Sequence, residues 1–343
     1  MRIGILTGGG DCPGLNATIR AIVKKGIKVY GDKMFGIRNG WAGLINNEIE
    51  PIPMSSVSGI LHRGGTMLGT SRTNPHRLED GVKKVKATIK KNKLDFIIAI
   101  GGEDTLGVAA KMSKDNVKII GVPKTIDNDL TGTIYTFGFD TAVSIITEAI
   151  DRLHTTAEAH QRVMVLEVMG RHAGWLAVTG GIAGGADLIL VPEEPYDIEE
   201  VCTSLQKRHN SGKTFSIVVV AEGAKPKGDH TLVTHDASLD AFGHVRLGGI
   251  GHELGRQIEE RTGFETRVTV LGHVQRGGTP TAFDRVLATR YGVGAIDGVH
   301  HNKVGQMVSL QGNTISYVSL AKVTSKIKTV DKNLLDIARV FFE

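Results

Sequence analysis

The sequence predicts an α/β protein in which strands, tight turns and helices alternate along the chain. Short apolar runs rich in β-branched residues recur, as in strands that are buried on both faces. Between these runs, apolar residues recur at spacings of three and four, which is typical of one face of a helix. The 44 glycines lie between the apolar runs, where tight turns are expected. We therefore expect parallel sheets with crossover helices, and 343 residues are enough for two lobes.

The predicted strands alternate with helical patterns. They comprise residues 3–6, 96–100, 119–122, 163–168, 188–191, 217–220 and 268–271. Leu15, Ile19 and Ile22 mark the apolar face of one helix, and Ile146 and Ile150 mark that of another. Because ligands of such folds bind beyond the carboxyl ends of the strands, we expect functional residues directly after each strand.

Charge and cysteine content argue against several classes of protein. The net charge of +5 favours an anionic partner. Nucleic acid is not expected, because the densest lysine segment, residues 82–93, is predicted to be the solvated face of a helix. Cys12 and Cys202 lie far apart and outside any metal-binding spacing, which supports neither a disulfide framework nor a zinc site. No apolar run is long enough for a membrane span and the first residues lack the features of a signal peptide, so we expect a cytoplasmic protein.

The first predicted strand ends in a glycine-rich turn, residues 7–14, that leads into a helix. Glycines there let backbone N–H groups approach a phosphate, and the helix N-terminus adds partial positive charge. The spacing matches neither a Walker A loop nor GxGxxG, and a tight turn without a ligand explains the glycines about as well. The GKT at residues 212–214 is no phosphate loop, because Lys207 stands where the upstream glycine belongs.

Carboxylates follow two further predicted strands. Glu103 and Asp104 come after Gly101 and Gly102, a plausible place for phosphate oxygens and Mg²⁺, although capping of the next helix is an equal alternative. Asp127 and Asp129 are one residue apart in a segment that Pro123 keeps from regular helix, so in extended geometry they share a face. One carboxylate could then accept a proton from an attacking hydroxyl while the other positions the donor; an Asp- and Asn-rich turn is the alternative.

Several motifs together resemble the phosphofructokinase family. They are GVPKTIDND at residues 121–129, MGR at 169–171, AEG at 221–223 and LGHVQRGG at 271–278. The resemblance runs from about residue 2 to about residue 300, and it is thin beyond that point. It implies two similar lobes, each a mostly parallel sheet flanked by helices. The lobes would be residues 1–138 with 251–304 for the phosphoryl donor, and 139–250 with 305–343 for the sugar phosphate.

The resemblance also assigns roles in phosphoryl transfer to fructose 6-phosphate. Asp127 is the expected general base toward the sugar 1-hydroxyl, with Thr125, Asp129 and Arg171 at the transferred group. Glu103 is expected to hold Mg²⁺, directly or through water. The expected donor residues are Gly9, Gly10, Arg72, Gly102, Asp104 and Lys124. The expected sugar-phosphate residues are Thr125, Asp127, Arg162, Met169, Gly170, Arg171, Glu222, Arg267, His273 and Arg276.

In the family pattern, Arg162 and Arg267 complete the site of a neighbouring subunit, so a homo-oligomer is expected, a tetramer or else a dimer. Inorganic pyrophosphate is the favoured donor and ATP the alternative. ATP-dependent relatives normally carry glycine in place of Asp104, and a carboxylate there would fill the space of the α-phosphate and repel its charge. Lys124 is a weaker indicator, with a solvated loop residue as its other interpretation. A dehydrogenase lacks support because GxGxxG is absent, and a sugar-phosphate sensor would not need both aspartates.

Overall fold

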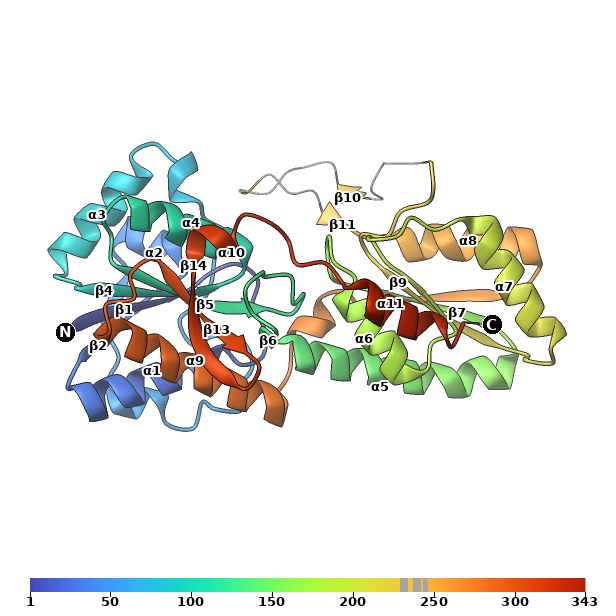
Figure 1. The fold of residues 1–343 in the computed structure, drawn as a ribbon, viewed down its shortest axis with the longest axis horizontal. Coiled ribbons are helices and arrows are strands. Elements are labelled where there is room, and N and C mark those ends of the chain that lie inside the picture. The colour runs from blue at the N-terminus through green and yellow to red at the C-terminus, as the bar shows by residue number, and fades with distance from the viewer. Residues whose placement is uncertain (229–233, 237–241, 243–245, 343) are drawn as a thin grey trace.

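Two sheets, each flanked by helices, form the framework of two lobes that lie side by side in Figure 1. The computed structural model describes residues 1–228, 234–236, 242 and 246–342. Within these residues the larger sheet has eight strands in the order β14-β13-β5-β4-β1-β2-β3, with β6 beside β5. Its strands are β1 (Arg2–Thr7), β2 (Lys33–Ile37), β3 (Ile49–Pro51), β4 (Phe96–Gly101), β5 (Ile119–Thr125), β6 (Phe137–Gly138), β13 (Gln306–Gln311) and β14 (Thr314–Ser319).

The smaller sheet has four strands among the described residues, in the order β12-β7-β9-β8, and all of its pairings are parallel. Its strands are β7 (Val163–Val168), β8 (Leu188–Leu190), β9 (Ser216–Ala221) and β12 (Thr266–Val270). A separate antiparallel pair joins β10 (Thr234–Asp236) to β11 (Arg246–Leu247). In the larger sheet, β2 with β3 and β13 with β14 pair antiparallel, and the remaining pairings are parallel. The predicted α/β class with mostly parallel sheets is confirmed.

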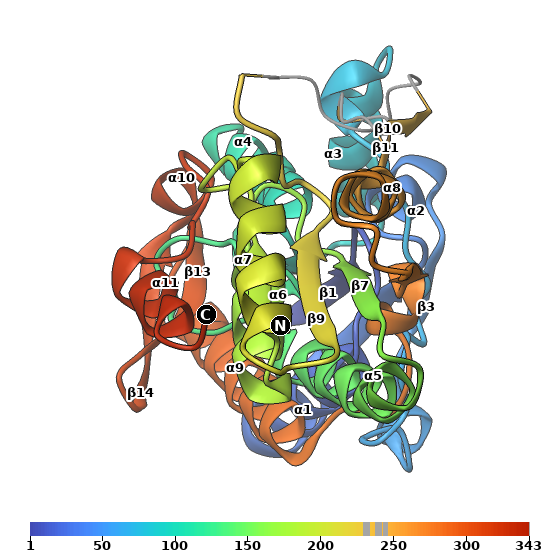
Figure 2. The ribbon, with the colours of Figure 1, turned by 90° about the vertical axis from the view of Figure 1, so that its right-hand side faces the viewer.

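Helices cover both faces of each sheet, as the end-on view of the smaller sheet in Figure 2 illustrates. On the larger sheet they are α1 (Leu15–Tyr30) and α9 (Ala282–His300) on one face, and α2 (Trp41–Asn46), α3 (Gly81–Lys91), α4 (Glu103–Lys114) and α10 (Leu320–Val323) on the other. On the smaller sheet they are α5 (Phe139–His160) and α6 (Trp175–Gly184) on one face, and α7 (Ile198–Asn210) and α8 (Ile250–Thr262) on the other. The short α11 (Lys332–Arg339) and the 3₁₀ turns η1 (Met54–Val57), η2 (Pro75–Arg77) and η3 (Gly272–Arg276) complete the set.

The continuous apolar runs of the strands fill both faces of each sheet. In β7, Val163 and Val165 belong to the cluster under α7 and α8, whereas Met164 and Leu166 belong to the cluster under α5 and α6. This alternation is the period of two that a strand imposes on its side chains. A sheet buried on both faces needs apolar residues at successive positions, which is why these strands show no polar alternation.

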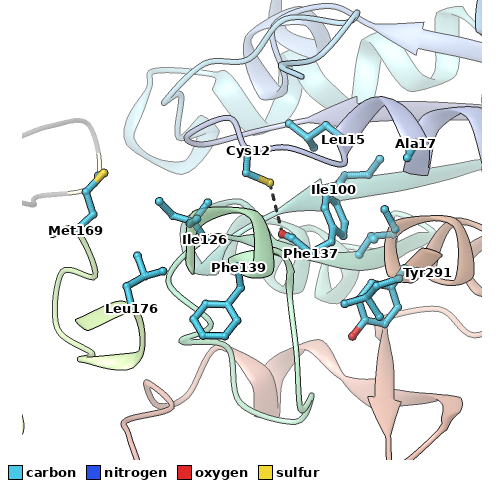
Figure 3. Packing of buried hydrophobic residues seen from close by; sticks show 14 of the residues in the cluster. Cys12, Leu15, Ala17, Ile100, Ile126, Phe137, Phe139, Met169, Leu176 and Tyr291 are labelled. Carbon is cyan, nitrogen blue, oxygen red and sulfur yellow. Dashed lines mark hydrogen bonds between the residues drawn. The ribbon is translucent and has the colours of Figure 1, made fainter. Parts of the chain in front are cut away.

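One apolar cluster continues from the first lobe into the second. Figure 3 shows members of this cluster from both lobes, among them Cys12, Ile126, Phe137 and Phe139 together with Leu176 of α6. The Cys12 thiol donates a hydrogen bond of 3.5 Å to the Phe137 carbonyl, and burial raises the pKa of this thiol. The thiol therefore stays protonated and serves as a packing residue of the lobe boundary.

The strand pairing differs from the predicted lobe boundaries at two places. The segment containing α8 and β12 was expected in the first lobe, but β12 pairs with β7 of the smaller sheet. The segment after residue 304 was expected in the second lobe, but β13 pairs with β5 and β14 of the larger sheet. The reason is packing: Val268 of β12 lies against Gly255 of α8, and Met307 and Val308 of β13 lie in the cores of the first lobe. The chain passes between the lobes at residues 138–139, 277–281 and 324–331.

None of the helices in the described ranges combines the length and the apolar character needed to cross a membrane.

Candidate active site

A pocket lies where β1, β4 and β5 end, with the loop after β7 and η3 on the side of the second lobe. It collects all six predicted donor residues and, counting Arg276, six of the other predicted site residues. They are Gly9, Gly10, Arg72, Gly102, Asp104 and Lys124, together with Glu103, Thr125, Asp127, Asp129 and Arg171. Arg276 also lines it, as do three residues that the sequence did not single out for the site, Asp11, Thr105 and Ile126.

Close backbone approach explains the glycines of the first turn. A Cβ atom at Gly10 would lie 2.3 Å from Nη1 of Arg276, so a larger residue would push that guanidinium out of the pocket. A Cβ atom at Gly8 would lie 2.6 Å from Oγ1 of Thr105, which fills the space between Gly8 and Gly101. Gly9 has a φ of 78°, a conformation that favours glycine. The turn thus brings backbone, Thr105 and Arg276 together on one wall.

Lys124 is buried, with 3% of its surface exposed, so its interpretation as a solvated loop residue was wrong. Its ammonium group donates a hydrogen bond to the Gly10 carbonyl, which joins the end of β5 to the turn after β1. Burial lowers the pKa of Lys124, and the nearby Asp127 and Asp11 carboxylates oppose that shift. A cation that lines the pocket in this way is suited to an anionic ligand.

Local hydrogen bonds hold the segment that carries the two aspartates. The Asp127 backbone N–H donates to Oγ1 of Thr125 at 3.1 Å, and the Thr136 hydroxyl donates to the Thr125 carbonyl at 2.8 Å. Asn128 has a φ of 51°, and its side-chain oxygen accepts from the Thr136 N–H at 3.1 Å. The side chains of Thr125, Asn128 and Thr136 therefore fix the turn, which leaves the carboxylates available to the pocket.

Both aspartates present a buried oxygen to the pocket. Among the described residues, one carboxylate oxygen of Asp127 and one of Asp129 are buried without a hydrogen-bond partner. Burial raises the pKa of Asp129 to about 7, with further contributions from the charges of Asp127 and Glu103. Buried polar atoms are normally satisfied, and buried oxygens in a polar pocket that are not satisfied indicate a place for a ligand, a metal or a proton.

The second lobe supplies Arg171 from a strained loop. Gly170 has a φ of 139° and Arg171 a φ of 52°, and Gly223 lies so close that a Cβ atom there would be 1.8 Å from the Arg171 carbonyl. The Arg171 N–H donates to Oε1 of Glu222 at 3.1 Å. Burial, and next the charge of Asp127, raise the pKa of Glu222 to about 7. Across the lobe boundary, the Arg171 guanidinium lies 4.0 Å from the Asp104 carboxylate.

Gln275 is a site residue that sequence reasoning missed. Its side chain is fully buried, its oxygen accepts from the Met169 N–H at 3.3 Å, and its amide nitrogen donates to the Gly272 carbonyl at 3.0 Å. It therefore fixes η3, and with it Arg276, against the loop that begins at Met169. Its position directly before Arg276 in LGHVQRGG was the available signal. Met169 itself is buried in the core, and His273 is exposed on η3.

Arg162 and Arg267 do not reach this pocket. Both lie at the amino ends of their strands, since Arg162 precedes β7 and Arg267 is the second residue of β12. Met169 and Gly170 follow the opposite end of β7. Both guanidinium groups instead contact the Glu265 carboxylate, that of Arg162 at 2.7 Å. Any ligand that these arginines bind must therefore lie at the amino ends of β7 and β12, away from this pocket.

Mg²⁺ fits the pocket only as an ion with few protein ligands. The described part of the chain contains no cluster of three or more His, Cys, Asp or Glu side chains arranged to hold a metal. Glu103 lies in the first turn of α4, whose cap is Gly102, and it lines the pocket together with Asp127 and Asp129. After burial and the charge of Asp127, the Glu103 charge also raises the pKa of Asp129. Mg²⁺ commonly takes one or two carboxylates and completes its shell with phosphate oxygens and water.

Known proteins resemble the chain over most or all of its length. A family model described as phosphofructokinase matches residues 2–299. The chain is 56% identical over 343 residues to a pyrophosphate–fructose 6-phosphate 1-phosphotransferase of Streptomyces coelicolor, which covers 100% of both chains. It is 52% identical over 330 residues, 96% of each chain, to the ATP-dependent 6-phosphofructokinase 3 of the same organism. A solved structure of phosphofructokinase from Saccharomyces cerevisiae matches with a TM-score of 0.82 and 30% identity, over 99% of this chain and 46% of the yeast chain.

Proposed function

The chain belongs to the phosphofructokinase family, and from that premise and the geometry of the pocket we propose that it transfers a phosphoryl group from inorganic pyrophosphate to the 1-hydroxyl of fructose 6-phosphate. The product is fructose 1,6-bisphosphate. The reaction runs in both directions because phosphoryl transfer from pyrophosphate releases less free energy than transfer from ATP. The curated relative of Streptomyces coelicolor that carries this activity in its name shares 56% of its residues with the chain over its whole length.

The position of Asp104 is the observation that carries the choice of donor. Asp104 lines the pocket and also a neighbouring hollow that Gly107 and Lys111 help to form. A donor longer than pyrophosphate would have to pass its α-phosphate along this carboxylate and into that hollow. A carboxylate beside a phosphate disfavours such a donor through repulsion and lost space, which can amount to several kcal/mol. Gly102, not Asp104, caps α4, so capping does not account for the residue.

The residues of the pocket divide the work of phosphoryl transfer. Asp127 accepts the proton of the attacking hydroxyl at its unpartnered buried oxygen. Thr125 holds the Asp127 backbone, and Arg171 faces the transferred group from the second lobe. Lys124 neutralises pyrophosphate from beneath the glycine turn, to which its ammonium is bonded. Such a reaction depends on positioning and positive charge, and closure of the lobes would exclude the water that hydrolyses the donor.

Mg²⁺ is proposed at Glu103, near Asp129, where it would neutralise charge on the phosphate oxygens. In this scheme the protein has to supply one or two carboxylates and an open shell for phosphate and water, which is what Glu103 and the unpartnered oxygen of Asp129 offer.

The sugar phosphate is proposed to lie between Met169, Glu222, His273 and Arg276, with its 6-phosphate bound by Arg162 and Arg267 of a neighbouring subunit. The separation of these two arginines from their own pocket supports this arrangement. It requires a homo-oligomer, for which we propose a tetramer, working in the cytoplasm. The lobes then divide the ligands, with the donor mainly on the larger sheet and the sugar on the smaller one.

ATP remains the second candidate donor, because the ATP-dependent relative is 52% identical. The proposed function is tested by incubating purified protein with fructose 6-phosphate, Mg²⁺ and pyrophosphate and following fructose 1,6-bisphosphate in a coupled assay. Formation of the bisphosphate in proportion to enzyme is the expected result. Absence of product with pyrophosphate would refute the proposal. Saturable quenching of protein fluorescence by NADH would point to a dehydrogenase instead.

A further inference from the structure

The segment between α10 and α11, residues 324–331, crosses from the first lobe to the second; we call it the C-terminal strap. It lies outside the matched residues 2–299, and Figure 1 shows it as the red connection that passes between the two lobes near their boundary. Between the two lobes, the strap contacts a segment next to the pocket. Its contacts concentrate on residues 128–136, the turn that follows the catalytic Asp127, here called the aspartate loop.

Backbone contacts align the strap with the aspartate loop. The Lys328 N–H donates to the Asp129 carbonyl at 2.8 Å, and Ile327 forms an antiparallel bridge with Leu130. The Thr131 hydroxyl donates to the carbonyl of Val323, the last residue of α10 directly before the strap, at 3.0 Å. The bridge and the Lys328 hydrogen bond together set the register of the strap against Asp129 and Leu130.

The Lys328 side chain bonds the same loop a second time. Its ammonium group donates to the carbonyls of Thr133 and Ile134, at 3.1 Å and 2.6 Å. It also lies 4.9 Å from the ring centroid of Trp175, the first residue of α6, and the Trp175 indole N–H donates to the Lys328 carbonyl at 2.9 Å. One residue thus joins the loop of the first lobe to a helix of the second.

The two ends of this assembly are anchored. On the first lobe, the Ile134 N–H donates to the Leu310 carbonyl at 3.1 Å, and the Leu310 N–H donates to the Thr133 hydroxyl at 3.0 Å. On the second lobe, the Val330 N–H donates to Glu193 at 2.9 Å, and Glu193 also accepts from the Gly174 N–H next to Trp175. The aspartate loop is consequently held between β13 and the strap, and the strap is tied to the base of the Arg171 loop through Glu193 and Gly174.

We propose that Lys328 is a positioning residue for the transfer reaction, which sets the aspartate loop, and with it Asp127, in register with Arg171 across the lobe boundary. The inference rests on the proposed function for its consequence in catalysis, but the placement of the strap does not depend on it. An ammonium group suits this role because it carries three N–H donors. Two of them bond the carbonyls of Thr133 and Ile134, and a side chain without donors would break both hydrogen bonds. Burial lowers the pKa of Lys328 to about 8, and the Asp129 charge opposes that shift.

The test compares Lys328→Met, which keeps the length of the side chain, with Lys328→Arg and with the control Lys332→Met, an exposed lysine at the start of α11. Because the group positions the base and does not bind the sugar, Lys328→Met should lower kcat by about ten- to a hundredfold while the KM for fructose 6-phosphate changes less than about threefold. Lys328→Arg should recover most of kcat, and Lys332→Met should match the wild type. Equal kcat for Lys328→Met and wild type would overturn the proposal, as would a loss confined to KM.

A spectroscopic readout tests the strap without any substrate. The chain has two tryptophans, and Trp41 is buried in a core of the first lobe, so Trp41→Phe leaves Trp175 as the only emitter. In that background, Lys328→Met should shift the emission maximum of Trp175 and Lys332→Met should not. An unchanged maximum in Lys328→Met would contradict the contact. If Lys328→Met shifts the emission maximum but the wild type shows no phosphoryl transfer, the proposed function fails and the strap stands.

Should Lys328→Met fail to fold, Trp175→Phe provides the second variant. It removes the indole N–H that holds the Lys328 carbonyl, and it should lower kcat in the same sense, by about threefold or more, with little change in KM. A folded Trp175→Phe enzyme with the wild-type kcat would count against the strap as a positioning element.

Discussion

The Arg171 guanidinium lies 4.0 Å from the Asp104 carboxylate, and this pair joins the two lobes across the pocket. Both side chains are about one-quarter exposed, so the attraction is partly screened by water and contributes little to stability. Its consequence is geometric. Asp104 stands directly opposite the arginine proposed to face the transferred phosphoryl group, and any donor bound there meets both charges.

Replacing Asp104 with glycine should transfer part of the donor preference from pyrophosphate to ATP. The change removes the volume and the charge of a side chain that lines both the pocket and the hollow near Gly107. Initial rates with each donor at equal concentration and saturating Mg²⁺ measure the effect, and the rate with ATP should rise by about tenfold or more. Asp104→Asn separates the causes, because it keeps the volume and removes the charge. A rate with ATP that is unchanged in both variants would show that Asp104 does not select the donor.

Removing the proposed base should abolish turnover without abolishing sugar binding. Asp127→Ser is expected to lower kcat by several orders of magnitude, since the base acts chiefly in the transition state. Isothermal titration with fructose 6-phosphate should give nearly the wild-type affinity. Asp151→Ser, an exposed position on α5, is the matched control and should change neither quantity. More than about a tenth of the wild-type kcat in Asp127→Ser would exclude Asp127 as the base.

Arg162 and Arg267 should act on the site of another subunit. In their own subunit both arginines contact Glu265, away from the pocket that holds Asp127. Because they are proposed to bind the 6-phosphate of a neighbouring subunit's substrate, alanine at either position is expected to raise the KM for fructose 6-phosphate. Co-expression of Arg162→Ala chains with Asp127→Ser chains, under two affinity tags, gives mixed oligomers. These should regain activity that neither variant shows alone. No regain in purified mixed oligomers would indicate that each site is built from one chain.

The stability of the ligand-free protein should fall as the pH rises through the range in which Glu222 titrates. Folding raises the pKa of this carboxyl from 4.5 to about 7, so the folded chain holds the proton more tightly than the unfolded chain. Stability is therefore greatest below the unfolded value and is lost as the pH rises toward the folded value. Thermal melts between about pH 4.5 and 7 should show this slope, and Glu222→Gln should make it shallower.

The control for the pH experiment is Glu259→Gln, an exposed position on α8. It should leave the slope of the melting temperature against pH unchanged. Equal slopes in the wild type and in Glu222→Gln would mean that the Glu222 carboxyl is not desolvated as the structure indicates. Buried Asp129 and Asp284 have raised pKa values as well, so the slope should diminish in Glu222→Gln without vanishing.

The pocket could be predicted from the sequence because its parts are local. Each wall is a short segment that follows one apolar strand, and the parallel arrangement brings the ends of such strands together. Glycine turns, the Asp127–Asp129 spacing and the arginine motifs could therefore be recognised one by one. The sequence also suggested Lys124 as a pocket residue, but its burial depends on the Gly10 carbonyl, which lies 114 residues away.

Contacts between segments that lie far apart in the chain could not be predicted from the sequence. Nothing near β12 or β13 specifies which sheet each one joins, because the partner strand is chosen by packing of helices such as α8 and α9. Lys328 escaped notice for a related reason. Its partners are the backbone carbonyls of Thr133 and Ile134. Every residue type has such a carbonyl, so the sequence does not indicate which ones accept a hydrogen bond.

The most direct test of the account is the choice of phosphoryl donor by the wild-type enzyme. Initial rates of fructose 1,6-bisphosphate formation are measured with pyrophosphate and with ATP, at equal concentrations, with saturating fructose 6-phosphate and Mg²⁺. The position of Asp104 opposite Arg171 predicts a rate with pyrophosphate that exceeds the rate with ATP by about tenfold or more. A rate with ATP equal to or greater than that with pyrophosphate would contradict the account.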